Sequence, residues 1–198
     1  MKQEYVYSPL PFSGKISLKK ELVVGLDFYS ILYKFGLNPS VLPSVFKGMH
    51  ITCMNKYYKV IGLRNANGGI EAFNEYKGPF TLKAYGVSVI KNHATLRSKE
   101  CCLFSNVLDY LAYLTLCSIK EFDVPRKCDC IILNHAKNVS AFILECDHYM
   151  VLHTFFPLSL IGKTLEKTLT SLYEDRVRSH IQIYSHSTSL LEYLGSLN

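Results

Sequence analysis

The side chains best placed for chemistry follow two apolar runs in the second half of the chain. Ser105 comes directly after residues 101–104, Asp109 lies four positions further on, and Pro157 and Ser159 follow a later run. Clustered carboxylates at such places would hold a divalent cation through oxygen, and the cation would offset charge developing on a phosphate. Only Asp109 carries a carboxylate here. The loops after these two runs therefore lack the cluster of acids that such a site would need.

The same side chains also suit a structural role at the beginnings of helices. Ser105, or Asn106 together with Asp109, could accept hydrogen bonds from the exposed backbone amides of a following helix. Ser159 could cap the next helix in the same way. A carboxylate in a first helical turn is also favoured by the helix dipole. Capping is therefore the simpler interpretation of Asp109, and a retained functional role is the alternative.

Four apolar runs, each followed by a helical pattern, must position these residues. Strands that are buried on both faces and separated by helices favour a parallel sheet with right-handed crossovers. Ligands of such sheets bind beyond the carboxyl ends of the strands. The expected strands are residues 101–104, 129–134, 149–156 and 181–184, and the expected helices lie near residues 107–114, 135–145, 160–172 and 190–194.

A resemblance to a known family is carried by several short segments. Residues 104–111, with the sequence Phe-Ser-Asn-Val-Leu-Asp-Tyr-Leu, resemble the Toprim domain of primases, as do residues 132–134 and 162–163. Residues 61–74 resemble the segment that precedes Toprim in the primase-like proteins of Bacteroides-type mobile elements. The likeness covers residues 25–198 and depends mainly on the order of its parts. It implies a Rossmann-like α/β domain with a central, mostly parallel sheet flanked by helices.

The resemblance also assigns a role to the strand ends. In the family, a Glu after the first strand and an Asp-x-Asp pair after the third hold magnesium for phosphoryl or nucleotidyl transfer. The matching positions are Ser105 and residues 157–159, and a later Asp-Leu-Asn element matches residues 189–191. Asp109 matches a further acid in the first helix. The resemblance therefore implies a degenerate Toprim site with no catalytic residue, metal or cofactor, formed by Ser105, Asp109, Pro157 and Ser159.

The first half of the chain predicts a smaller α+β lobe. A helix would end at Gly36, and the turn before residue 70 contains Gly68 and Gly69. We expect an arm over residues 1–20, a helix over residues 22–35, and antiparallel strands over residues 50–54, 57–63 and 70–74. The lobe is expected to span residues 1–95 and the Toprim-like domain residues 96–198, with a hinge between Lys91 and Lys99.

The charge of the chain is concentrated in its first half. Residues 1–100 contain 14 Lys or Arg and 6 Asp or Glu, a net charge of +8, and residues 101–198 contain 8 and 10, a net charge of −2, which together give +6. A basic surface favours nucleic acid because bound cations release condensed counterions. An ordinary solvated surface is the alternative. The candidate contacts are Lys56, Lys59, Arg64, Lys77, Lys83, Lys91 and Arg97, interleaved with Tyr57, Tyr58, Tyr76 and Tyr85 as possible platforms for bases.

Three functions remain open from the sequence. The first is a noncatalytic nucleic-acid-binding or accessory protein of DNA replication or mobilisation. It would be a pseudoenzyme that binds DNA or RNA through its basic lobe, with a replication or mobilisation protein as a further candidate partner. The second is a divergent magnesium-dependent primase or nuclease that recruits Asp109, Glu145 or Asp147. The third is a protein-interaction subunit that docks through exposed Phe155 and Phe156.

Composition limits the cellular setting. No apolar segment approaches the roughly 18 residues that span a bilayer, and the beginning lacks the apolar core of a signal peptide, so we expect a cytoplasmic protein without a membrane partner. Seven cysteines are an odd number, and Cys101, Cys102 and Cys130 lie in expected buried strands, which is consistent with a reducing compartment. A zinc site from Cys128 and Cys130 with Cys146 and His148 does not fit the usual ligand spacing.

Overall fold

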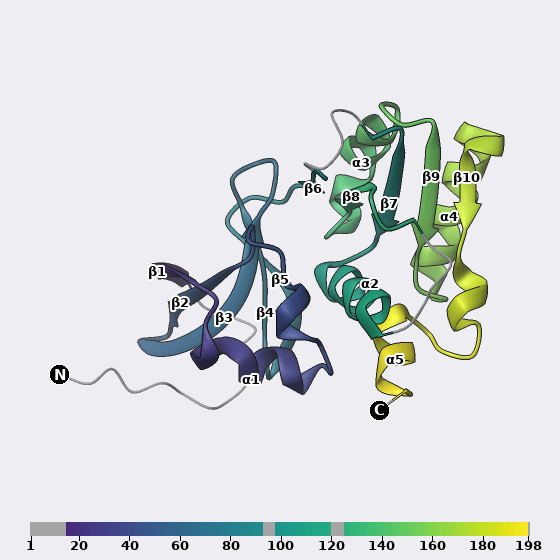
Figure 1. Ribbon diagram of the computed structural model, residues 1–198. Coiled ribbons are helices and arrows are strands. Elements are labelled where there is room, and N and C mark those ends of the chain that lie inside the picture. The colour runs from purple at the N-terminus through teal and green to yellow at the C-terminus, as the bar shows by residue number, and fades with distance from the viewer. Residues whose placement is uncertain (1–14, 93–97, 120–124, 198) are drawn as a thin grey trace.

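The computed structural model describes residues 15–92, 98–119 and 125–197. It contains two five-stranded sheets that lie side by side, with α2 (Val107–Ile119) between them (Figure 1). The mixed α/β architecture expected from the sequence is confirmed. Most of the expected arm, most of the expected hinge, and Arg97 lie outside the described residues. Among the described residues, no helix has the length and apolar character needed to cross a membrane.

The first sheet is antiparallel and follows the chain in order, from β1 to β5. The hairpin of β2 and β3 turns at Met54 and Asn55, which both have positive φ, as a tight two-residue turn requires. α1 (Leu26–Lys34) begins four residues later than expected, because the preceding residues continue β1. The strands are β1 (Ile16–Val23), β2 (Lys47–Cys53), β3 (Lys56–Arg64), β4 (Ile70–Asn74) and β5 (Lys77–Leu82).

The second sheet has the order β10-β9-β7-β8-β6. Its strands β7 to β10 run parallel, and β6 pairs antiparallel with β8. The strands are β6 (Ser88–Ile90), β7 (Glu100–Phe104), β8 (Asp129–Ile132), β9 (Val151–Phe155) and β10 (Val177–Ser179). The remaining helices are α3 (Val139–Cys146), α4 (Leu160–Tyr173) and α5 (Leu190–Gly195), with short 3-10 helices η1 (Pro39–Val41), η2 (Ala136–Asn138), η3 (Glu174–Arg176) and η4 (Ile181–Tyr184).

The last expected strand was placed wrongly. Ile181–Tyr184 forms the 3-10 helix η4, and the fourth parallel strand is β10, immediately before it. β10 has one strand neighbour in the described sheet and consists of Val-Arg-Ser, so it carries little of the apolar signal of a buried strand. Tyr184, the last residue of η4, is instead part of the core and is 1% exposed.

Both faces of the second sheet are buried, which contradicts the exposed docking surface expected at the end of β9. Phe155 stacks on Phe104 with ring centroids 5.3 Å apart, on the face covered by α2. Phe156 packs near Phe142 of α3 on the other face, with centroids 6.2 Å apart. The two residues are 1% and 2% exposed. They form core rather than a surface for a partner.

The two sheets share one hydrophobic core around α2. Phe28 and Phe46 from the first half of the chain belong to the same buried cluster as Phe104 and Tyr110. Phe46 stacks on Tyr110 with centroids 6.3 Å apart. The chain enters the second sheet already at β6, ahead of residue 95, where the sequence suggested a domain boundary. The division into residues 1–95 and 96–198 stays a prediction.

Candidate functional site

The loop after β7 begins α2 with a side-chain cap. The Oδ1 atom of Asn106 accepts hydrogen bonds from the backbone amides of Leu108 at 2.9 Å and Asp109 at 3.1 Å. These amides have no partner within the helix, so the asparagine satisfies two exposed donors. The structural interpretation of this loop is therefore confirmed for Asn106.

Asp109 is a buried carboxylate whose two oxygens are both engaged. Its Oδ2 accepts hydrogen bonds from Asn106 Nδ2 at 2.7 Å and Ser105 Oγ at 3.3 Å, and its Oδ1 accepts from the Leu191 amide at 3.3 Å. Asp109 is 2% exposed. Burial raises the pKa of this carboxyl above its ordinary value, although the hydrogen bonds act in the opposite direction. The side chain therefore ties the beginning of α2 to α5.

The loop after β9 positions α4. Ser159 Oγ accepts a hydrogen bond from the Gly162 amide at 3.3 Å, as expected of a helix cap. The helix lies so close to the loop that a Cβ atom at Gly162 would be 2.0 Å from the carbonyl oxygen of Pro157. The Leu158 amide donates to the carbonyl oxygen of Thr188 at 2.7 Å.

These loops meet at one edge of the sheet. Phe104 and Phe155 are register partners on adjacent parallel strands, so the residues that follow them leave the sheet side by side. Residues 188–191 contact both loops, through Leu158 on one side and Asp109 on the other. The structure thus brings together the three places to which the resemblance assigns acids. Asp109 is the one carboxylate among these residues.

Magnesium does not fit this edge. The ion needs several oxygen ligands with negative charge, whereas Ser105 and Ser159 are neutral and Pro157 has no side-chain donor. Asp109 already accepts three hydrogen bonds and is shielded from solvent. Among the described residues, this edge therefore lacks the cluster of carboxylates that the resemblance to Toprim implies.

The acids of the alternative magnesium site lie elsewhere. Glu145 and Asp147 precede β9, whereas Asp109 follows β7, so they occupy opposite edges of the sheet. A five-residue strand such as β9 spans about 16 Å at 3.3 Å per residue. Asp147 instead accepts a hydrogen bond from the Tyr173 hydroxyl at 2.7 Å. The expectation that these acids could surround one ion with Asp109 is wrong.

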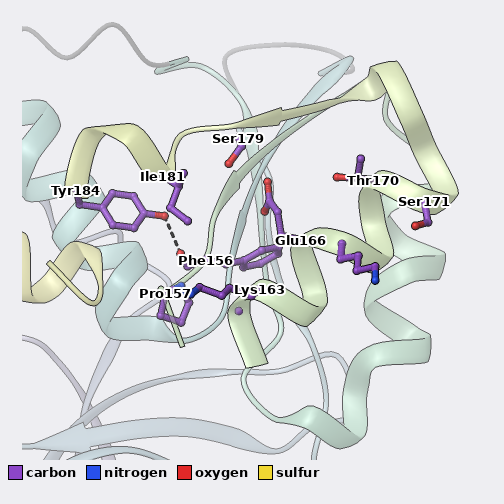
Figure 2. A pocket seen from close by; sticks show the side chains of 11 residues that line it. Phe156, Pro157, Lys163, Glu166, Thr170, Ser171, Ser179, Ile181 and Tyr184 are labelled. Carbon is purple, nitrogen blue, oxygen red and sulfur yellow. Dashed lines mark hydrogen bonds between the residues drawn. The ribbon is translucent and has the colours of Figure 1, made fainter. Parts of the chain in front are cut away.

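A cavity opens beside the same edge, at the carboxyl ends of β9 and β10 (Figure 2). It has a volume of about 320 Å³ and includes Pro157, Glu166, Lys163 and Lys167 in its wall. Glu166 Oε1 accepts a hydrogen bond from the buried Thr154 hydroxyl at 2.8 Å. One carboxylate between two lysines does not make a magnesium site. This cavity could not be predicted from the sequence, because its wall combines three separate segments.

Two of the candidate basic residues have acidic partners. Arg64 forms an ion pair with Glu21 of β1. Lys91 Nζ lies 3.1 Å from Asp129 Oδ2 and 2.6 Å from the hydroxyl of Tyr149. Burial alone would raise the pKa of Asp129, but hydrogen bonds from the Asn92 amide, Tyr149 and Lys91 hold it below its ordinary value. Lys91 therefore has a structural role.

The other described candidates are distributed over the first sheet. Lys56 and Lys77 lie at the two hairpins that close one end of the sheet, and Lys83 follows β5 at the other end. Lys59 lies over the ring of Phe28 at 5.9 Å. The structure does not gather these lysines into one cluster. Among the proposed base platforms, Tyr58 is 2% exposed and belongs to the core of the sheet, so its assignment was wrong.

Two aromatic rings and a lysine, which the sequence did not reveal as a group, lie beside the loop that follows β7. The ring of Tyr85 contacts the ring of His135 with centroids 4.4 Å apart, and Lys137 Nζ lies 5.0 Å from the Tyr85 centroid. The Asn134 amide donates to the Ser105 carbonyl oxygen at 2.9 Å, which places His135 next to the loop after β7. Tyr85 is 43% exposed. Two adjoining rings with a lysine could meet a base and a phosphate.

Comparison with known proteins identifies the fold. No protein-family model and no curated protein matches the chain. The primase fragment of the bacteriophage T7 primase-helicase protein is similar in structure, with a TM-score of 0.59 and 16% sequence identity over 91% of this chain and 77% of the fragment. A chain in the structure of the bacteriophage T7 lagging-strand DNA polymerase interacting with primase domains aligns with a TM-score of 0.48 and 15% identity, over 83% of this chain and 88% of that chain. The first likeness shows that the chain has a primase-like fold.

Proposed function

We propose that this chain is a noncatalytic relative of primases that binds nucleic acid, or assists proteins that do, in the replication or mobilisation of DNA. The observation that carries the proposal is the carboxyl edge of β7 and β9, where three loops converge and Asp109 is their one carboxylate. We further propose that the second sheet with its helices is a degenerate Toprim-like domain, similar to those of Bacteroides-type mobile elements. A primase-like fold supports this assignment.

The absence of catalysis follows from charge at that edge. Phosphoryl transfer needs cations to offset the negative charge that develops on phosphate oxygens. Ser105, Pro157 and Ser159 cannot recruit a divalent cation, and Asp109 is bonded to its own helix and to α5. The edge therefore cannot supply the electrostatic stabilisation that phosphoryl transfer needs.

Nucleic-acid binding is supported by the remaining charge. The first hundred residues carry a net charge of +8, and Lys56 and Lys83 are exposed. The group formed by Tyr85, His135 and Lys137 adds an aromatic surface beside the degenerate edge. We assign the main phosphate contacts to Lys56, Lys77 and Lys83, and smaller contributions to Lys59, Arg64, Lys91 and Arg97.

Fluorescence anisotropy of the full chain with single-stranded DNA, double-stranded DNA and RNA, over a range of salt concentrations, tests this function. The logarithm of the binding constant should fall linearly with the logarithm of salt concentration. Replacing Lys56, Lys77 and Lys83 together by alanine should weaken binding and reduce the slope for a single strand by about 2. The matched control replaces Lys127, Lys163 and Lys167, which removes the same charge from the second half of the chain.

Two results would contradict the proposal. Binding that does not respond to salt, or no binding to any of the three nucleic acids, would remove the phosphate-contacting role of the basic half. Equal losses in the two triple variants would show that net charge, rather than the first sheet, determines affinity. Undetectable binding together with concentration-dependent mass would favour a protein-interaction subunit.

A further inference from the structure

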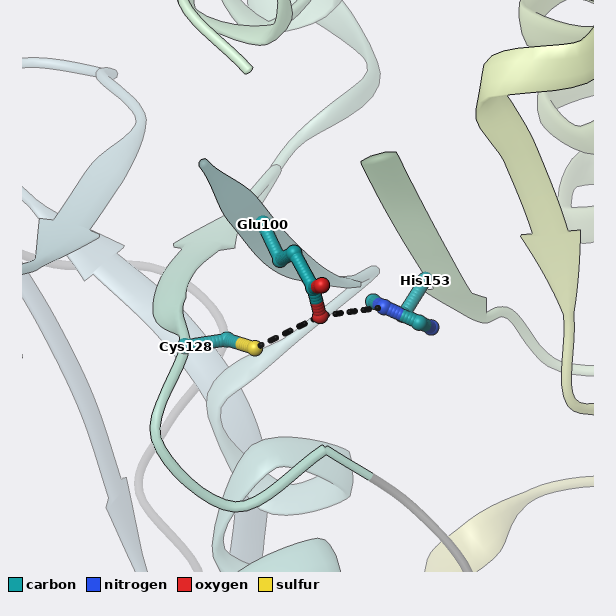
Figure 3. Close-up of side chains that lie close together, drawn as sticks. All are labelled: Glu100, Cys128 and His153. Carbon is teal, nitrogen blue, oxygen red and sulfur yellow. Dashed lines mark hydrogen bonds and ion pairs between the residues drawn. The ribbon is translucent and has the colours of Figure 1, made fainter. Parts of the chain in front are cut away.

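Three side chains meet at the amino edge of the second sheet, away from the degenerate site. Figure 3 shows the side chains of Glu100 in β7, His153 in β9 and Cys128 in the loop just before β8 pointing toward one another. The Glu100 Oε2 atom lies 3.2 Å from His153 Nε2 and 3.7 Å from Cys128 Sγ. All three ligand-type atoms lie within 4.8 Å of one another. A carboxylate oxygen, a thiol sulfur and an imidazole nitrogen are the three kinds of protein ligand that zinc accepts.

The strand register explains why these residues converge. Cys102 of β7 pairs with His153 of β9 on one side and with Cys130 of β8 on the other. Residues two apart on a strand share a face, so Glu100 lies on the same face as Cys102 and His153. Cys128 immediately precedes β8 and reaches the same place. The group is thus fixed by three parallel strands rather than by a flexible loop.

Two of the three spacings suit a tetrahedral metal site. With metal–ligand bonds of about 2.0–2.3 Å, sulfur, nitrogen and oxygen ligands of one zinc ion lie about 3.4–3.6 Å apart. The two distances to the Glu100 oxygen, 3.2 and 3.7 Å, are close to these values. The third distance, from Cys128 Sγ to His153 Nε2, is within 4.8 Å, so small movements of the side chains would complete the site.

The imidazole of His153 is also held in a suitable orientation. Its Nδ1 atom lies 2.9 Å from Nε2 of His180, so the nitrogen that faces away from Glu100 already has a partner. A metal-bound histidine usually donates its second ring N–H to such an acceptor, which fixes the ring and its tautomer. His153 is mostly buried, with a side chain that is 12% exposed, while Glu100 is 47% exposed.

A route for an ion leads to the group from solvent. Glu100 and Cys128 both line an open cavity of about 530 Å³, together with Ser98 and Arg126. Three protein ligands leave a fourth tetrahedral position, which water can occupy from the cavity side. Lys99 and Lys127 line the same cavity and add positive charge. The thiolate of Cys128 and the carboxylate of Glu100 would therefore have to supply the negative charge that attracts the cation.

We propose that Glu100, Cys128 and His153 bind one zinc ion, with water as the fourth ligand. On binding, the Cys128 thiol releases its proton to solvent and bonds to the ion as thiolate. His153 bonds through Nε2 and carries its proton on Nδ1, where it is donated to His180. The ion joins β7, β8 and β9 at their amino ends. This site is independent of the function proposed above.

Cobalt titration of the full chain, freed of metal by a chelator, tests the site. Co²⁺ occupies tetrahedral zinc sites, and a cobalt–thiolate bond adds charge-transfer absorption in the near ultraviolet. We expect one equivalent of Co²⁺ to produce this absorption together with strong visible bands, and one equivalent of Zn²⁺ to abolish both. Zn²⁺ should also raise the temperature of unfolding, because it binds the folded chain.

Variants assign the ligands. Cys128→Ser should abolish the charge-transfer absorption, and Cys117→Ser, which changes a half-buried thiol on α2, should leave it unchanged. Glu100→Gln, at a partly exposed position that tolerates change, should weaken Co²⁺ binding by about 10-fold or more while the thiolate absorption persists at saturation. No thiolate absorption in the unaltered chain, or equal absorption in Cys128→Ser, would overturn the proposal, as would unchanged affinity in Glu100→Gln.

Discussion

At the scale of single residues, Asp109 shows how an acid can persist without a catalytic task. Its oxygens accept hydrogen bonds from Ser105, Asn106 and the Leu191 amide, and these bonds join two helices that are far apart in sequence. The sequence predicted capping in this loop, because Ser, Asn and Asp follow a strand. The bond to Leu191 could not be predicted, since it depends on where the last helix packs.

Asp109→Ala should lower the free energy of unfolding by about 1–3 kcal/mol, because the Leu191 amide and the Asn106 side chain would lose a buried partner. Nucleic-acid affinity of the folded variant should be unchanged. Urea unfolding and anisotropy measure the two quantities. Asp175→Ala removes an exposed carboxylate and is the control. Unchanged stability with lost affinity would show that Asp109 acts on a ligand instead.

Glu71 gives a pH-dependent prediction. It is 3% exposed and accepts hydrogen bonds from Asn65 at 2.7 Å and Thr81 at 2.7 Å. Burial raises the pKa of its carboxyl, with the two hydrogen bonds acting in the opposite direction. An acid whose pKa is raised on folding contributes fully to the stability of the protein below its pKa in the unfolded chain. This contribution is lost as the pH rises through its pKa in the folded protein.

Glu71→Gln should therefore gain stability relative to the unaltered chain as the pH rises from about 5 to about 8, because glutamine stays neutral. Its amide can donate to the Thr81 hydroxyl while its oxygen accepts from Asn65. Urea unfolding at several pH values measures the difference, and Glu174→Gln controls for the loss of one negative charge. A difference that is independent of pH, or that reverses, would contradict the assigned direction.

At the scale of secondary-structure elements, the sequence predicted the strands that are buried on both faces. β7 and β9 are mostly apolar, and their residues belong to the two core clusters on opposite faces of the sheet. β10 escaped prediction because it is a short polar strand with a single neighbour among the described strands. The beginning of α1 was misplaced because the apolar residues Leu22 and Val23 end β1 and only two residues separate β1 from α1.

The beginning of α4 depends on a close approach that only glycine allows. A Cβ atom at Gly162 would lie 2.0 Å from the Pro157 carbonyl oxygen, so the helix would have to move away from the loop. Gly162→Ala should lower the free energy of unfolding by about 1–3 kcal/mol despite the better helix propensity of alanine. Gly78→Ala, where no atom lies within 4 Å, should change it little. Chemical denaturation of both variants compares them, and equal stability would refute the contact.

At the scale of the whole molecule, the two sheets fold around one core. Phe46 and Leu32 from the first half pack in the same cluster as Tyr110 and Phe155 from the second. The chain therefore has a common core although its two halves differ in topology and charge. The sequence suggested two units because charge and periodicity change near residue 95, whereas the shared core depends on long-range packing that no local pattern records.

Phe46→Ala should destabilise both sheets together. Phe46 is 2% exposed and stacks on Tyr110, so truncation should cost about 3–5 kcal/mol. In hydrogen exchange, the central amides of β3 and of β7 should lose protection by similar factors. Tyr33→Ala, at a residue that is 64% exposed, is the control. Loss of protection confined to the first sheet would show that the halves unfold independently.

The candidate site was predictable in part. The neutral residues after β7 and β9 could be read from the sequence because the order of strands and loops locates the carboxyl edge. The contact between Tyr85 and His135 and the group of Glu100, Cys128 and His153 could not. Both depend on the pairing of strands that are far apart in the chain: Tyr85 and His135 lie beside the antiparallel pair β6 and β8, and Glu100 and His153 lie on the parallel strands β7 and β9. Residues that are neighbours in the sequence do not record such long-range pairing.

The most direct test of the central claim is anomalous diffraction from crystals of this protein grown with Mn²⁺. The account predicts no manganese at the carboxyl edge formed by Ser105, Pro157 and residues 188–191, because Asp109 is the one carboxylate there and is fully bonded. A manganese peak at this edge, coordinated by two or more carboxylates, would contradict it.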